Sequence, residues 1–170
     1  MTNININADH DSWVYEALSS TNFGSDTIMK LHHASNYEHI AYIKWSDLSD
    51  IPANAIITSA TCYLYVSDTI SGTNTVQLAG GSWSEGSITW NNQPDATGGT
   101  LFTFNASSLG WKTGDLTDTV KDWHKGNITN NGVRIITSGA GWAYLDTSET
   151  ANEPYLSIDY KVPVPKIIIL

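Results

Sequence analysis

The segment 55–67 constrains the fold more than any other part of the chain. Small or apolar residues alternate there with more polar ones, in the order Ala60, Thr61, Cys62, Tyr63, Leu64, Tyr65 and Val66. Alternation with a period of two is typical of a β-strand that buries one face. We therefore expect a strand whose apolar face, including Cys62 as a small buried hydrophobe, packs against a second layer.

Similar alternation recurs along the chain between turns rich in Gly, Asn, Ser and Asp. It predicts further strands at 3–7, 12–17, 27–33, 37–45, 75–78, 87–90, 101–104, 133–137, 143–146 and 155–160. Short strands at such spacing are typical of antiparallel sandwiches, not of parallel α/β sheets. The sequence thus predicts an all-β, jelly-roll β-sandwich that occupies residues 1–161 as one domain.

One short helix is expected after residue 115. Asp115 is a good N-cap residue, and Gly126 is a suitable C-terminal stop. Leu116, Val120 and Trp123 repeat at helical spacing between them. This pattern predicts an amphipathic helix whose apolar stripe packs on the sandwich.

Residues 162–170 form a distinct tail with two prolines. Proline lacks an amide donor, so we expect the tail to be extended and outside any sheet interior. Burial of each large apolar side chain is worth about 1.5–3 kcal/mol. We expect the tail to pack on the parent domain or on a neighbouring subunit through Val162, Val164, Ile167, Ile168, Ile169 and Leu170.

The formal charge of −9, from 17 acidic against eight basic residues, limits the partners. Nucleic acid and anionic membranes are disfavoured, because both carry negative charge. The N-terminus lacks the features of a secretory signal, and no apolar run reaches membrane-spanning length. We expect protein subunits or a surface polysaccharide as partners, and a virion or extracellular location.

Several motifs follow one another in the order found in a known domain family. The most specific is the block 83–94, Trp-Ser-Glu-Gly-Ser-Ile-Thr-Trp-Asn-Asn-Gln-Pro. The others lie at 11–14, 22–25, 41–45, 56–66, 110–111, 116–118, 123, 148–149 and 154–160. In these residues the chain resembles the DNRLRE-type domain, which is related to carbohydrate-binding module family 96 and to methanogen disaggregatase repeats. The resemblance implies a jelly-roll sandwich without catalytic machinery and, for some relatives, a bound glycan or calcium ion.

Exposed aromatic residues are candidates for binding a glycan, because flat rings stack on sugar rings. Tyr63 and Tyr65 on one strand, with Tyr42 and Lys44 on another, form a platform if those strands adjoin. In the alternative, this face is covered by another layer. The negative charge argues against an acidic glycan such as alginate, which some relatives suggest, and favours a neutral one.

Calcium is the one cofactor that the sequence suggests. The ion needs about six oxygen ligands. Acidic residues near the first and last strands, which are often neighbours in a jelly roll, are the candidate ligands: Asp9, Asp11, Asp26, Asp146 and Glu149. The alternative is that these are ordinary solvated acids, since no loop of EF-hand spacing is present.

No enzymatic activity is expected. Glycoside hydrolysis requires two carboxylates about 5–10 Å apart in a cleft. The acids of the chain lie in no motif that demands catalysis, and Glu85 is expected to brace the turn that follows it.

Two non-catalytic functions remain. The first is a virion surface protein, such as a capsid decoration, cement or tail-fibre protein. The alternative is a carbohydrate-binding module, with or without calcium, from a secreted or cell-surface protein.

Overall fold

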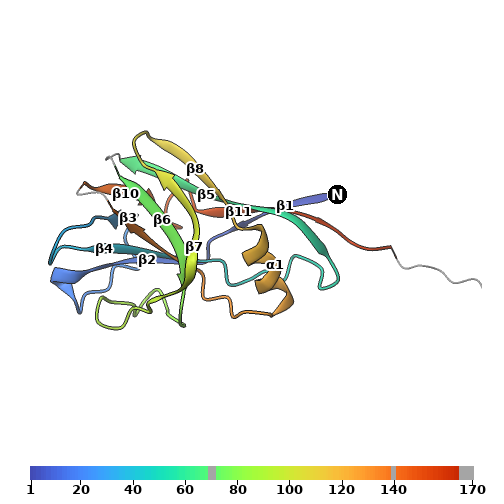
Figure 1. The fold of residues 1–170 in the computed structure, drawn as a ribbon, viewed down its shortest axis with the longest axis horizontal. Helices are drawn as coiled ribbons and strands as arrows, with labels where there is room; N and C mark the ends of the chain where they lie inside the picture. The colour runs from blue at the N-terminus through green and yellow to red at the C-terminus, as the bar shows by residue number, and fades with distance from the viewer. Residues whose placement is uncertain (69–71, 139–140, 165–170) are drawn as a thin grey trace, which may run out of the picture.

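Two antiparallel sheets face each other in the computed structural model, which describes residues 1–68, 72–138 and 141–164 (Figure 1). The six-stranded sheet contains β1 (Thr2–Asn7), β11 (Tyr155–Lys161), β5 (Ile56–Asp68), β10 (Ala143–Asp146), β3 (Ile28–Leu31) and β8 (Gly110–Asp115). The five-stranded sheet runs in the order β2 (His10–Tyr15), β4 (His39–Lys44), β9 (Val133–Thr137), β6 (Thr73–Ala79) and β7 (Ala96–Asn105). The predicted all-β sandwich is confirmed.

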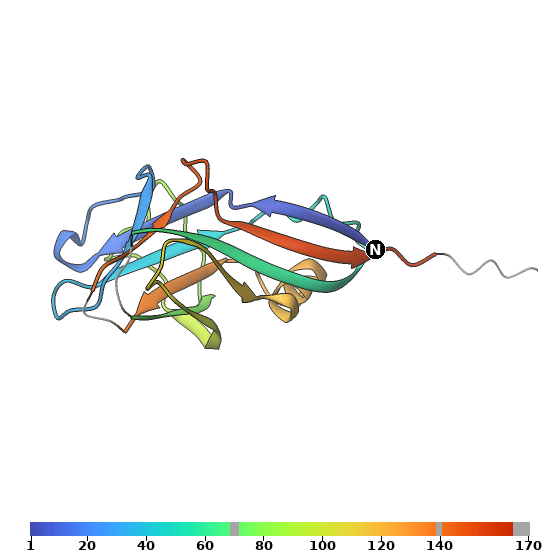
Figure 2. The same ribbon diagram turned by 90° about the horizontal axis from the view of Figure 1, so that it is seen from above.

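Strand β5 organises the six-stranded sheet. It pairs with β11 along residues 56–63, with β8 along residues 61–66, and with β10 near its end. Figure 2 shows β11 between β1 and β5, as the pairing requires. Ala60, Cys62, Leu64 and Val66 are buried, whereas the residues between them are half-buried on the outer face. The alternation predicted for this strand is therefore confirmed.

The space between the sheets is filled by apolar side chains. Its fully buried large members include Trp45, Met29, Leu31, Ile43, Leu64, Ile135, Leu145, Leu156 and Ile158. These residues come from both sheets, so the sheets share one interior. Burying the side chains of both inner faces is what holds a sandwich together.

The predicted helix is present as α1 (Thr117–Lys125). Val120 and Trp123 are buried in the core, as is Leu116, which occupies the N-cap position. Asp115 was expected there; instead its carboxylate accepts a hydrogen bond from the Thr117 amide at 2.8 Å, one residue before the cap. Gly126 ends the helix in the left-handed region at φ 69°, where glycine carries no steric penalty. Of the helices within the described residues, none has the length and apolar character needed to cross a bilayer.

The segment between β6 and β7 differs most from expectation. Residues 87–90 were predicted to be a strand, but they form turns, in which the amides of Ser87 and Ile88 donate to the Ser84 carbonyl at 3.1 and 2.9 Å. This segment lies over the outer face of the five-stranded sheet and buries a second apolar cluster. Its buried members are Val14, Ile40, Tyr42, Ala79, Trp83 and Ile88.

The C-terminal tail is only partly described. Val162 and Val164 are exposed, by 47% and 89%. Ile167, Ile168, Ile169 and Leu170 lie outside the described residues. The predicted packing of the tail thus stays a prediction.

Candidate functional site

The structure separates the two halves of the predicted glycan platform. Tyr42 and Lys44 lie on β4, in the opposite sheet from Tyr63 and Tyr65 on β5. Tyr42 is fully buried, and its hydroxyl donates to the carbonyl of Pro94 at 2.7 Å. The side chain of Lys44 lies over the Trp83 ring. The prediction that Tyr42 and Lys44 contribute to the platform is wrong, because the segment 80–95 covers their face of the sheet.

Tyr63 and Tyr65 instead gather with two other aromatic residues on the outer face of the six-stranded sheet. Tyr155 of β11 stacks on Tyr63, with ring centroids 4.5 Å apart and planes 6° from parallel. Trp111 of β8 stands nearly perpendicular to both, with centroid distances of 6.2 Å to Tyr63 and 5.2 Å to Tyr155. It also meets Tyr65 edge-on at 5.2 Å. We call Tyr63, Tyr65, Trp111 and Tyr155 the aromatic cluster.

Strand pairing explains why these rings meet. Tyr65 lies opposite Trp111 in the β5–β8 pair, and Tyr63 lies opposite Tyr155 in the β5–β11 pair. Side chains directly opposite on one face of antiparallel strands have Cβ atoms about 4.5–5.5 Å apart. Trp111 is 42% exposed, although a large aromatic side chain gains by burial. The cluster therefore presents an open indole ring on a rigid three-strand base.

A shallow pocket of about 320 Å³ adjoins the cluster. Asn5, Asn7, Trp111, Ala151, Glu153 and Tyr155 line it. The Asn7 side-chain amide donates to a Glu153 carboxylate oxygen at 2.5 Å, which links β1 to the segment that precedes β11. The aromatic wall thus stands beside amide and carboxylate groups that can donate and accept hydrogen bonds.

The electrostatic character of the pocket is acidic. Glu153 is the one charged residue among those that line it. In the described part of the chain, the Lys and Arg residues in ion pairs are Lys121 and Arg134, and their partners are aspartates elsewhere. Partial burial, with a further contribution from Tyr63, raises the pKa of Tyr155 above its ordinary value. Its hydroxyl is protonated at neutral pH, as for any tyrosine, and can donate a hydrogen bond.

Sequence reasoning missed five of the residues that form this site, namely Trp111, Tyr155, Asn5, Asn7 and Glu153. Tyr155 begins a strand that was predicted, and it alternates with buried Leu156, so its outward direction could have been found. Trp111 carried a weaker signal. Its strand, β8, contains Gly110 and Gly114, and glycine disfavours strand interiors.

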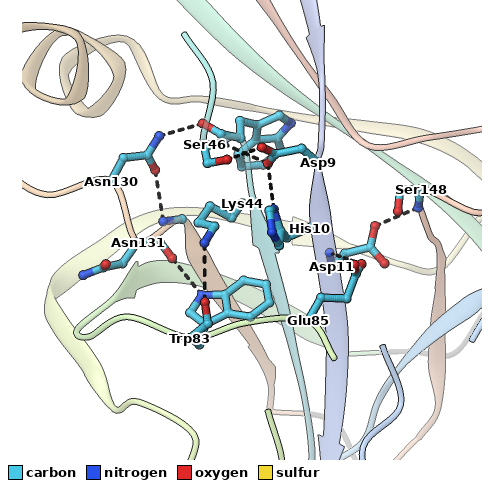
Figure 3. A network of polar contacts seen from close by, with 12 residues as sticks. Asp9, His10, Asp11, Lys44, Ser46, Trp83, Glu85, Asn130, Asn131 and Ser148 are labelled. Atoms are coloured by element: carbon cyan, nitrogen blue, oxygen red, sulfur yellow. Dashed lines mark hydrogen bonds and ion pairs between the residues drawn. The ribbon is translucent and has the colours of Figure 1, made fainter. Parts of the chain in front are cut away.

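The block 83–94, the most specific part of the family resemblance, is held in place by hydrogen bonds to other segments of the chain. Its Trp83 indole donates to the Asn131 carbonyl at 2.8 Å, and a Glu85 carboxylate oxygen accepts the Asp11 amide at 3.0 Å (Figure 3). Asn22 donates to two carbonyls of the block, at 2.6 and 2.8 Å. Glu85 was expected to brace the turn that follows it; instead it ties the block to β2.

The five candidate calcium ligands do not converge. Asp9 binds Ser46, Asp26 binds the Trp13 indole, and Asp146 binds Asn152. Glu149 is exposed on a loop, next to the segment that contacts Asp11. Among the residues that the structure describes, no three His, Cys, Asp or Glu side chains are arranged to hold a metal ion. The geometry thus does not join these acids into one site.

Asp11 is nevertheless unusual. Its side chain is only 1% exposed. One carboxylate oxygen accepts the Ser148 amide at 2.7 Å, and the other is buried without a hydrogen-bond partner among the described residues. Burial raises the pKa of Asp11 to about 7; the Ser148 hydrogen bonds oppose this rise, and the charges of Glu149 and Glu85 add to it. Figure 3 shows the Asp11 carboxylate directed at Ser148.

A larger hollow, of about 470 Å³, lies between the loop 46–53 and α1. Apolar side chains, including Leu48 and Ile51, form much of its wall. Its aromatic residue, Trp123, is only 6% exposed and belongs to the core. It offers no open ring comparable with that of Trp111, so we take the aromatic cluster as the candidate site.

Comparison with known proteins identifies the family of the chain but not its site. A comparison with curated proteins gave no match. Residues 2–160 match the family model described as carbohydrate-binding module family 96. Since this match covers nearly the whole chain, the chain belongs to carbohydrate-binding module family 96.

Proposed function

We propose that this domain binds a soluble, neutral polysaccharide through the aromatic cluster on the outer face of its six-stranded sheet. The observation that carries the proposal is the exposed Trp111 ring, 42% open to solvent and braced by Tyr65, Tyr63 and Tyr155. A rigid, exposed aromatic residue is a common anchor for ligand binding. Membership of a carbohydrate-binding module family supports a sugar as that ligand.

The ring geometry favours single polymer chains over crystalline surfaces. Trp111 is inclined by 75° to 80° to Tyr155, Tyr63 and Tyr65. Rings in such an arrangement cannot all lie flat against one planar crystal face. They can hold a flexible chain, in which one sugar unit stacks on Trp111 while its neighbours contact ring edges and the polar groups of the pocket.

The proposed role is binding without catalysis. The family is one of binding modules, and the pocket beside the cluster contains one carboxylate, that of Glu153. Hydrolysis by either common mechanism uses two carboxylates across the scissile bond. We therefore expect no release of reducing ends from any polymer that the domain binds.

The family supports the carbohydrate-binding interpretation better than the virion-surface interpretation. An assembly role for the tail stays a prediction, and deletion of residues 162–170 tests it. If the tail drives assembly, the truncated domain remains folded but sediments as a smaller species. An extracellular location, where a polysaccharide ligand is accessible, is part of the proposal.

Affinity electrophoresis and calorimetry against a panel of neutral soluble polysaccharides test the proposed function. We expect Trp111→Ala to weaken binding about tenfold or more, since anchor residues commonly contribute over ~1.4 kcal/mol. Tyr155→Ala should weaken it less. The matched control is Tyr37→Ala, which removes an aromatic side chain 54% exposed outside the cluster. Equal binding by the Trp111→Ala variant and the wild type, with both folded, would contradict the proposal.

A further inference from the structure

The shallow pocket beside Trp111 places polar groups next to the exposed aromatic ring. It combines two aromatic walls, Trp111 and Tyr155, with the amides of Asn5 and Asn7. Its volume of about 320 Å³ lies at the small end of ligand pockets, ~300–1,000 Å³. A pocket of this size has room for only a short part of a polymer chain. The groups that line it would therefore contact one or two sugar units.

Glu153 is the charged residue in the lining of this pocket, so it has the strongest effect on whether neutral or charged sugars bind there. Its carboxylate is held in place on one side, where one oxygen accepts the Asn7 amide at 2.5 Å. Among the described residues, the other oxygen has no hydrogen-bond partner. That oxygen is an acceptor for a ligand hydroxyl, and hydrogen bonds to charged groups are stronger than neutral ones.

The same carboxylate repels an anion. No lysine or arginine lines the pocket, and no ion pair among the described residues involves Glu153. Like charges placed against each other across an interface suppress the wrong partner.

We propose that Glu153 is a specificity-determining residue, which accepts a hydrogen bond from a neutral sugar unit and excludes acidic sugars from the pocket. This inference rests on the proposed function, because it assumes that glycans bind at the aromatic cluster. Asn7 is a positioning residue, which holds the Glu153 carboxylate at the pocket wall. The excluded class consists of uronic acids, whose carboxylate replaces the hydroxymethyl group of the neutral sugar.

Pairs of polymers that differ only at C6, where one has a hydroxymethyl group and the other a carboxylate, provide the test. Mixed-linkage β-glucan, glucomannan and soluble starch are each compared with the same polymer oxidised at C6 to the uronate. For the wild type we expect binding about tenfold tighter to the neutral member, since water screens the repulsion between like charges at an open pocket to roughly that factor. The difference should shrink as ionic strength rises, because salt screens exposed charges.

Glu153→Gln keeps the size of the side chain but removes the charge. Its one oxygen can still accept the Asn7 amide, and its NH2 group can donate to the sugar hydroxyl, which is also an acceptor. We expect it to bind neutral polymers within about threefold of the wild type and to lose most of the tenfold discrimination. The control variant is Asp118→Asn, which removes the same unit of charge from an exposed position on α1 and should leave the discrimination unchanged.

The outcomes separate this inference from the proposed function. If Trp111→Ala abolishes binding but Glu153→Gln leaves the ratio of neutral to oxidised binding unchanged, the aromatic cluster binds glycan and the role of Glu153 is refuted. Tighter wild-type binding to the oxidised polymers also refutes it. If the wild type binds no polymer in either form, the proposed function fails and this inference fails with it.

Discussion

The buried carboxyl of Asp11 makes the stability of this domain depend on pH in a direction opposite to that of most acidic residues. Its folded-state pKa of about 7 lies above the ordinary 3.8, because burial penalises the charged form. In the folded state, therefore, the group retains its proton over a range in which the unfolded chain has lost it. The stabilisation is fully present below about pH 4 and is lost as the pH rises through about 7.

The size of the effect follows from the same two values. Each unit of difference between folded and unfolded pKa is worth about 1.36 kcal/mol, so ionisation of Asp11 costs about 4 kcal/mol in total. About 3 kcal/mol of this loss falls between pH 5 and pH 8. Asp11→Asn is the matched perturbation, since asparagine has the shape of the protonated acid and can still accept the Ser148 amide.

Urea unfolding of the wild type and of Asp11→Asn at pH 5, 6, 7 and 8, with EDTA present throughout, measures this difference. We expect the free energy of unfolding of the wild type to fall relative to that of the variant by about 3 kcal/mol across the range. Asp159→Asn, at a half-buried carboxylate whose pKa is lowered by hydrogen bonds from Asn3 and Ser59, serves as the control. Parallel curves for the wild type and Asp11→Asn would refute the reasoning.

Three further perturbations test the packing and the metal prediction. Trp83→Ala should cost about 3–5 kcal/mol in chemical unfolding, because it empties the centre of the second apolar cluster; a loss below 1 kcal/mol would contradict that role. Gly24→Ala should cost about 1–3 kcal/mol, because a Cβ would collide with the backbone carbonyl of Glu85, while Gly99→Ala, in open space, should change little. We expect the melting temperature to be equal in calcium and in EDTA, since the candidate carboxylates do not form a metal-binding group. An increase of several degrees in calcium would show that the domain binds the ion.

The inward and outward directions of side chains could be predicted from the sequence, because they depend on local geometry. A strand alternates its side chains whatever it pairs with. The direction of Cys62 inward and of Tyr63 outward followed from this rule. The buried stripe of Val120 and Trp123 followed from the 3.6-residue period of a helix. These features need only the neighbouring residues in the chain.

The partners of each face could not be predicted in the same way. Tyr42 and Tyr63 both point away from the interior between the sheets, yet Tyr42 is fully buried and Tyr63 is half-buried. The difference comes from the segment 80–95, which covers one outer face through contacts between residues some 50 positions apart, such as that of the Tyr42 hydroxyl with Pro94. The period of the sequence predicts which side chains share one face of a strand, but not whether another segment covers that face.

The candidate site was hidden for the same reason. Trp111 lies nearly 50 residues after Tyr63 and over 40 before Tyr155, and the three meet only because β5 pairs with both β8 and β11. Asn7 joins them through the pairing of β1 with β11, which brings together the two ends of the domain. Each pairing is non-local, so the short motifs of the sequence do not contain it.

The block 83–94 and the aromatic cluster therefore carry different kinds of information. Trp83 and Glu85, which make the family resemblance specific, are engaged in holding a loop over the five-stranded sheet and in binding the backbone of β2. Trp111, which is free to contact a ligand, lies on the other sheet in a motif of only two residues. The first group belongs to the scaffold, whereas on the proposed function the sugar that the domain selects depends on the second group and on the charge of Glu153 beside it. We therefore expect that exchanging Glu153 for a neutral or basic residue leaves the packing of the sandwich intact and, on the proposed function, changes only the charge of the glycan that binds.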